Sequence, residues 1–192
     1  MNSAKAKSVP RIACIGWGSL IWEPRDLPLT GDWHSDGPIL PVEFARQSSD
    51  DHITLVLVES DHRVPTLWAE MKVETVAQAV EALKAREGVP NKSSIGRWPN
   101  DTQREYISSD VIAEWAAANG VQAVVWTALL PGMKEKRGSV PTLDELAAHL
   151  AKLEGAALAK ARNYIANAPT QIATPYREEL AKACDASPSD TP

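Results

Sequence analysis

Short apolar runs separated by polar joints fill the first half of the chain, and a helical period of three to four residues follows later. The runs predict strands at residues 11–15, 39–47, 52–59 and 64–73, and a further strand at 121–130. The Asp-rich or charged joints at 48–51 and 60–63 are typical of hairpin turns.

Helix boundaries are marked by capping signals. Thr75 and Gln78 form a capping box that predicts a helix running to about residue 87, where Gly88 and then Pro90 end it. Thr142 and Glu145 form a second capping box, which opens an Ala- and Leu-rich helical region predicted to reach residue 167. Two shorter helices are expected at 110–119 and 176–183.

Strands that cluster early, with helices inserted and then appended, favour an α+β fold with a mainly antiparallel sheet or a small barrel. A chain of 192 residues is long enough to bury a core without disulfides or metal. We expect a single domain over residues 10–184, with flexible polar termini at 1–9 and 185–192.

Charge and composition exclude several classes of function. The net charge of −5 argues against nucleic acid as a partner, because no basic excess is present to neutralise phosphates. No apolar run reaches the length of a membrane span, and the N-terminus lacks the apolar core of a signal peptide, so we expect a cytoplasmic protein. The seven Trp residues against one Phe indicate that several indoles line a partly polar cavity.

One carboxylate falls where a core residue is expected. The apolar stripe of the first predicted helix is Val76, Val80 and Leu83, and its next position is Glu87. Burial and the partial negative charge of the helix C-terminus both disfavour an ionised carboxylate there, as in a general base. The alternative is that the helix frays early and Glu87 points to water beside Arg86.

A glycine-rich turn is the second candidate. The predicted strand at 11–15 runs into Gly16, Trp17, Gly18, Ser19 and Leu20, whose backbone N–H groups could bind a carboxylate or a developing oxyanion. A dinucleotide site is not supported, because Ile21 occupies the place of the third glycine and Pro24 follows. A plain turn between core elements is the alternative.

Other chemistry-bearing residues give weaker signals. The four His residues show no helical pair spacing, so no metal site is expected, and with the dinucleotide pattern also incomplete no cofactor is expected. Cys14 lies inside an apolar strand and is interpreted as a small core residue. The basic loop at 131–141 could clamp an acidic substrate, although solvated loop charge is the simpler interpretation.

The two candidate segments together resemble one family. Residues 15–24, Ile-Gly-Trp-Gly-Ser-Leu-Ile-Trp-Glu-Pro, closely resemble the first motif of γ-glutamylcyclotransferase-like proteins, above all the ChaC branch, whose usual form is G-Y-G-S-L-I-W-x-P. Residues 83–87, Leu-Lys-Ala-Arg-Glu, are similar to the family's second motif, L-x-x-R-E. The resemblance covers residues 11–90. Trp17 departs from the usual Tyr, and Thr66-Leu-Trp68 stands where a W-G pair is expected.

The resemblance implies a small mixed or antiparallel barrel with packed helices and one pocket at its mouth. It also implies cyclisation of a γ-glutamyl group to 5-oxoproline, with Glu87 as the general acid and base and residues 16–20 as the substrate-binding loop. The two departures keep open a non-catalytic protein of the same fold that binds a small ligand or a partner. An amidase or acyl-transferring enzyme is a third possibility. The sequence does not define the oligomeric state.

Overall fold

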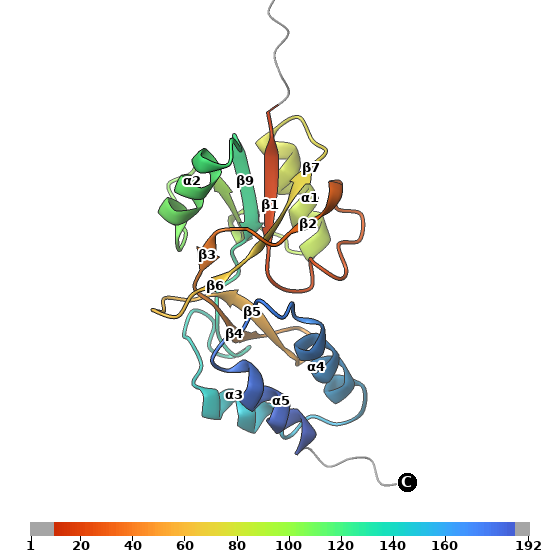
Figure 1. Cartoon of the computed structure of the whole chain (residues 1–192). Helices are drawn as coiled ribbons and strands as arrows, with labels where there is room; N and C mark the ends of the chain where they lie inside the picture. The colour runs from red at the N-terminus through yellow and green to blue at the C-terminus, as the bar shows by residue number, and fades with distance from the viewer. Residues whose placement is uncertain (1–9, 187–192) are drawn as a thin grey trace, which may run out of the picture.

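A computed structural model describes residues 10–186, and its strands form three sheets (Figure 1). The largest sheet has five strands in the order β2-β7-β1-β9-β8, which are Leu29–His34, Leu67–Met71, Ile12–Gly16, Ala123–Thr127 and Ile95–Trp98. Strand β1 pairs antiparallel with β7 and parallel with β9. The sheet is therefore mixed, and β1 lies at its centre with every residue buried.

Two small sheets complete the β structure. Strand β3 (Ile39–Leu40) pairs with β6 (Val64–Pro65), and β4 (Val42–Gln47) pairs with β5 (Ile53–Leu57). The α+β class is confirmed. The predicted barrel is not, because the edge strands β2 and β8 of the large sheet do not pair with each other and none of the sheets formed by residues 10–186 closes on itself.

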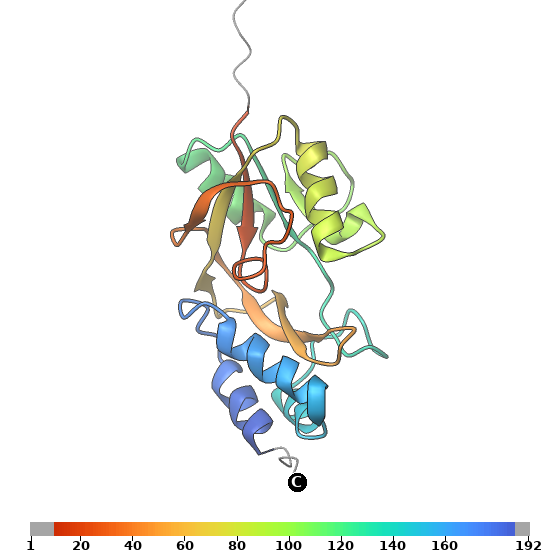
Figure 2. The same cartoon turned by 90° about the vertical axis from the view of Figure 1, so that its right-hand side faces the viewer.

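Five α-helices flank these sheets. They are α1 (Val76–Glu87), α2 (Ser109–Ala118), α3 (Leu143–Leu150), α4 (Gly155–Asn167) and α5 (Arg177–Asp185), with one 3₁₀ turn, η1 (Lys92–Ser94). Helices α1 and α2 pack on the five-stranded sheet, whereas α3, α4 and α5 gather around the β4–β5 hairpin at the other end of the molecule (Figures 1 and 2). Over residues 10–186, no helix is both long and apolar enough to cross a membrane.

Helix α1 follows the sequence prediction at both ends. Thr75 and Gln78 make the reciprocal hydrogen bonds of a capping box. At the other end, Gly88 adopts a left-handed conformation (φ 63°), and its N–H bonds back to the carbonyl groups of Ala85 and Lys84. Because the helix ends at Gly88, Glu87 is its last residue.

The C-terminal helical region differs from the prediction. The single region expected from 142 to 167 is two helices, α3 and α4, which meet at a turn where Gly155 has a φ of +50°. The capping box at Thr142 is confirmed. Residue Asp185, expected in a flexible tail, is the last residue of α5; the predicted flexible segments 1–9 and 187–192 lie outside the described residues.

Several observed strands differ from the predicted ones, because strand pairing depends on residues that are far apart in the sequence. Pro41, which has no N–H to donate to a ladder, separates β3 from β4 within the predicted strand 39–47. The turn at 48–51 does join a hairpin, but the one at 60–63 does not, because β5 pairs back to β4 while β6 pairs with β3. Strands β2 and β8 are not among the predicted strands.

One apolar core links the two ends of the molecule. A single cluster of buried side chains contains Ile15 and Trp126 from the large sheet, Phe44 from the hairpin, and Leu146 and Ile165 from the C-terminal helices. The loop after β1 therefore lies between the large sheet and the hairpin. A single domain over residues 10–184 stays a prediction.

Candidate functional site

A cavity of about 600 Å³ opens where the loop after β1, the end of α1, the β4–β5 hairpin and α4 converge. Its volume lies within the range of small-molecule sites. Its lining combines charged, hydroxyl and aromatic groups: Trp17, Gly18, Ser19, Leu20, Trp22, Glu23, Arg25, Arg46, Ser48, Ser49, Asp50, His52, Thr54, Leu55, Glu87, Gly88, Val89, Thr127, Leu129, Lys160, Asn163 and Tyr164. Both segments singled out in the sequence thus reach one cavity.

The loop after β1 is a tight double turn. The N–H of Ile21 donates to the carbonyl of Gly18 at 3.0 Å, and the N–H of Glu23 donates to the carbonyl of Ser19 at 2.9 Å. The N–H groups of Gly18 and Leu20 have no acceptor among residues 10–186. These two amides are the ones available to bind an anionic group of a ligand.

The five loop residues do not contribute equally. Trp17, Gly18, Ser19 and Leu20 line the cavity, whereas Gly16 is outside its lining and lies against Trp33. The indole N–H of Trp17 donates to the carbonyl of Leu55 at 3.2 Å, so this buried ring ties the loop to β5. Of the seven Trp residues, only Trp17 and Trp22 line the cavity, fewer than we expected.

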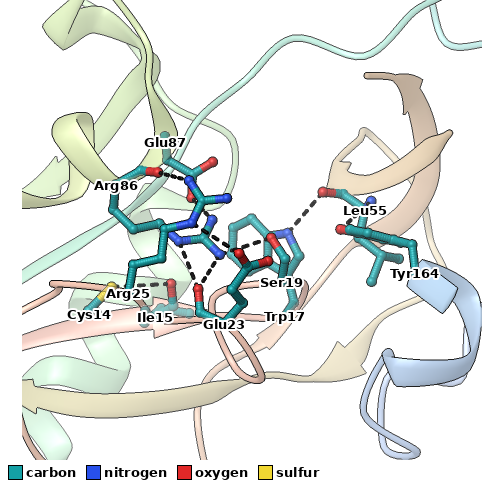
Figure 3. A network of polar contacts seen from close by, with 10 residues as sticks. All are labelled: Cys14, Ile15, Trp17, Ser19, Glu23, Arg25, Leu55, Arg86, Glu87 and Tyr164. Atoms are coloured by element: carbon teal, nitrogen blue, oxygen red, sulfur yellow. Dashed lines mark hydrogen bonds and ion pairs between the residues drawn. The ribbon is translucent and has the colours of Figure 1, made fainter. Parts of the chain in front are cut away.

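Glu87 is largely withdrawn from solvent, with its side chain 14% exposed, and it faces the cavity. Arg86 Nη1 donates to Glu87 Oε1 at 2.8 Å, as the close view in Figure 3 shows. The glutamate does lie beside Arg86, as the alternative interpretation held, but inside the cavity wall rather than in bulk water. The guanidinium therefore fixes one carboxylate oxygen of Glu87 in the cavity wall.

Arg86 also connects the helix to the glycine loop. Its buried guanidinium donates to the Ser19 hydroxyl at 3.1 Å and to the carbonyl of Glu23 at 2.7 Å (Figure 3). Arg25, exposed at the rim, donates in turn to the carbonyl of Arg86 at 3.4 Å. The planar guanidinium of Arg86 therefore fixes the position of the Glu87 carboxylate relative to the loop after β1.

Two further cavity residues, which the sequence analysis did not single out as site residues, come from other parts of the chain. His52 directly precedes β5. Its Nδ1 shares a hydrogen bond with the Ser48 hydroxyl at 2.9 Å, and burial lowers the pKa of its imidazole. Tyr164 comes from α4, and its ring meets His52 with centroids 5.1 Å apart. The signal for Tyr164 was present, because it lies three residues after Ala161 on the apolar stripe of the helical region.

The remaining sequence candidates are placed elsewhere. In the basic loop, Lys134 pairs with Asp51 at 2.6 Å and Arg137 donates to the carbonyl of Gln47, so these charges anchor the loop rather than line the cavity. Cys14 is fully buried in β1, and burial raises the pKa of its thiol. Within the described part of the chain, no group of three or more His, Cys, Asp or Glu side chains is placed to hold a metal ion.

No protein-family model and no curated protein matches the sequence. Two of the solved structures that are similar to this chain come from yeast. Both are titled as a γ-glutamyl cyclotransferase specific to glutathione from yeast, one of them selenomethionine-labelled.

The first has a TM-score of 0.47 and 17% sequence identity, and the aligned region covers 92% of this chain and 96% of the chain in that structure. The second has a TM-score of 0.42 at 16% identity, with coverages of 92% and 98%. At these values the similarity does not by itself assign an activity to this chain.

Replacing Gly18 by Ala is expected to destabilise the protein by about 1–3 kcal/mol, because overpacking a filled site forces its neighbours to move. A Cβ atom at Gly18 would lie 2.5 Å from the Tyr164 hydroxyl oxygen, and the next atom of that ring is 3.6 Å away. Urea unfolding measures the loss. The matched control is Gly18→Ala combined with Tyr164→Phe, in which the clashing oxygen is absent and the cost should largely disappear. Equal costs in both backgrounds would contradict this contact.

Proposed function

We propose that the protein cyclises γ-glutamyl compounds, releasing 5-oxoproline and the amine or amino acid that the γ-glutamyl group carried. The observation that supports this most is the position of the Glu87 carboxylate and the free amides of Gly18 and Leu20 on one cavity of small-molecule size. The resemblance of residues 15–24 and 83–87 to the two motifs of γ-glutamylcyclotransferase-like proteins supports the same activity.

The reaction needs few groups because the substrate contains its own nucleophile. The α-amine attacks the γ-carbonyl of the same molecule, so the enzyme has only to fold the γ-glutamyl group into the reactive shape. The α-ammonium must first lose a proton, and Glu87 is the proposed acceptor. Attack forms the new C–N bond of the five-membered ring and places negative charge on the carbonyl oxygen.

Collapse of that intermediate breaks the bond to the departing nitrogen. In total, the α-nitrogen loses two protons on becoming the lactam N–H, and the departing nitrogen gains two on leaving as an ammonium group. Glu87 can return protons that it has taken, so the balance needs no second acid. Arg86 keeps the carboxylate oriented toward the cavity through the 2.8 Å bond between its Nη1 and Oε1.

The test is direct. Purified protein is incubated with glutathione, other γ-glutamyl dipeptides and γ-glutamyl amines, and 5-oxoproline is measured. We expect catalytic turnover of at least one of these compounds. Release of free glutamate instead would indicate an amidase, and quenching of the cavity tryptophans by these compounds without any conversion would indicate a non-catalytic binding protein. Either result would contradict the proposal.

A further inference from the structure

Tyr164 is held in the cavity wall by contacts with neighbouring aromatic rings. It lies in the third turn of α4 and is 8% exposed. Its ring meets Trp22 edge-on with centroids 5.2 Å apart, and it meets His52 at 5.1 Å. Because aromatic packing fixes the ring, the direction of the hydroxyl is fixed as well.

The Tyr164 oxygen already accepts hydrogen bonds from the protein. The backbone N–H of Leu55 donates to it at 3.3 Å, and the amide of Ser19 is a second partner of the same oxygen. The hydroxyl proton, by contrast, has no acceptor among residues 10–186. A buried donor left without a partner is costly, so the proton of Tyr164 is available to a ligand in the cavity that it lines.

The loop after β1 leaves room for the Tyr164 hydroxyl at Gly18. Gly18 lacks the Cβ atom that would otherwise lie 2.5 Å from the Tyr164 oxygen. In Figure 3 the side chain of Tyr164 points from α4 toward Trp17 and Ser19, with Glu87 on the other side of these two residues. A ligand that contacts Gly18 and Leu20 is thus flanked by Glu87 and by Tyr164.

The phenol remains protonated across the range in which proteins work. Burial raises the pKa of Tyr164 far above its ordinary value of 10, and the negative charge of Glu87 raises it further. A hydroxyl in this state is a hydrogen-bond donor and not a base. It is therefore suited to an oxygen that gains negative charge during a reaction.

From this geometry we propose that Tyr164 is a catalytic residue that donates a hydrogen bond to the γ-carbonyl oxygen of the substrate as the ring closes. The inference rests on the proposed function. Glu87 must face the attacking α-amine, so the group across the cavity from it meets the carbonyl oxygen. The amides of Gly18 and Leu20 then bind the α-carboxylate of the substrate. No proton is transferred to or from Tyr164; only the tetrahedral oxyanion is stabilised.

The variant Tyr164→Phe tests the proposal because it removes the hydroxyl and keeps the ring. We expect kcat for 5-oxoproline formation to fall by about 10²-fold, the usual effect of losing one oxyanion donor, with little change in KM. The matched control is Tyr106→Phe. Tyr106 is also 8% exposed, but it packs on Trp126 and is not part of the cavity lining. This control should retain the kcat of the unmodified protein.

A second measurement separates catalysis from a structural role, because Tyr164→Phe also deprives the amides of Leu55 and Ser19 of an acceptor. Tetrafluorotyrosine placed at position 164 keeps the acceptor and lowers the pKa of the phenol far enough to bring its ionisation toward the range in which the protein is folded. We expect kcat of this protein to fall with rising pH at values where the unmodified protein and Tyr164→Phe show no such fall.

The possible outcomes can be told apart. Turnover by the unmodified protein together with an unchanged kcat in Tyr164→Phe, or a tetrafluorotyrosine pH profile that matches that of the unmodified protein, would overturn the role of Tyr164 alone. A lowered thermal unfolding temperature and lost binding of 5-oxoproline in Tyr164→Phe, without an added alkaline fall in the tetrafluorotyrosine profile, would make its role structural and overturn the proposal. No turnover by the unmodified protein would overturn the proposed function, and this inference with it.

Discussion

Replacing Glu87 by Gln is expected to lower kcat for 5-oxoproline formation by about 10²–10⁴-fold, the range for loss of a general base. The amide keeps the shape of the side chain and its place beside Arg86 Nη1, now 2.8 Å from Glu87 Oε1, but it cannot accept the proton of the α-ammonium group. Because the side chain remains a hydrogen-bond acceptor, substrate binding should change much less than kcat. Steady-state kinetics on the best γ-glutamyl substrate gives both parameters.

The control for this experiment is Glu81→Gln in the same helix. Glu81 is about half exposed and pairs with Lys92 at 2.5 Å and Lys84 at 3.7 Å, away from the cavity. It should leave kcat unchanged. Thermal unfolding should be the same for Glu87→Gln as for the unmodified protein within a few degrees. Full activity in Glu87→Gln would remove Glu87 from the mechanism.

Replacing Arg86 by Met is expected to destabilise the protein by about 3 kcal/mol, because removing one partner of a buried ion pair leaves the other charge uncompensated. Arg86 and Glu87 have side chains only 6% and 14% exposed. The substitution also leaves the Glu23 carbonyl without the donor that now lies 2.7 Å away. Urea unfolding should show a lower midpoint, and 5-oxoproline formation should fall in the fraction that remains folded, since Glu87 loses its orientation.

Two further variants make that result specific to Arg86. Arg25→Met removes an exposed arginine of the same network, whose side chain is 56% exposed, and should cost less than about 0.5 kcal/mol. Arg86→Lys keeps the charge without the planar fork and should be intermediate. If Arg86→Met were as stable as Arg25→Met, the ion pair would not be holding the cavity wall together.

The parts of this fold that sequence predicts well are those determined by neighbouring residues. The two capping boxes, at Thr75 and Thr142, and the left-handed cap at Gly88 are local hydrogen-bond patterns, and each occurs where the sequence indicates it. The inward position of Glu87 follows from the same helical period. These features need no knowledge of what the helix packs against.

The features that escaped prediction depend on partners far away in the chain. Strand β2 has mostly exposed residues and exists because it pairs with β7. The sequence assigned Arg86 no role of its own, but it is buried because the carbonyl of Glu23 and the hydroxyl of Ser19 approach it from the loop after β1. Gly16 was assigned to the substrate-binding loop by its place in the motif, but its position outside the cavity lining and beside Trp33 depends on packing that the motif does not show.

The cavity lining is assembled from residues that are synthesised far apart in time. Its walls join Trp17, made early, to Lys160 and Tyr164, made near the end. A ribosome-bound chain that has exposed only the five-stranded sheet and the β4–β5 hairpin lacks the helix that completes this space. The cavity wall is therefore incomplete in any chain that ends before α4, because Lys160, Asn163 and Tyr164 lie on that helix.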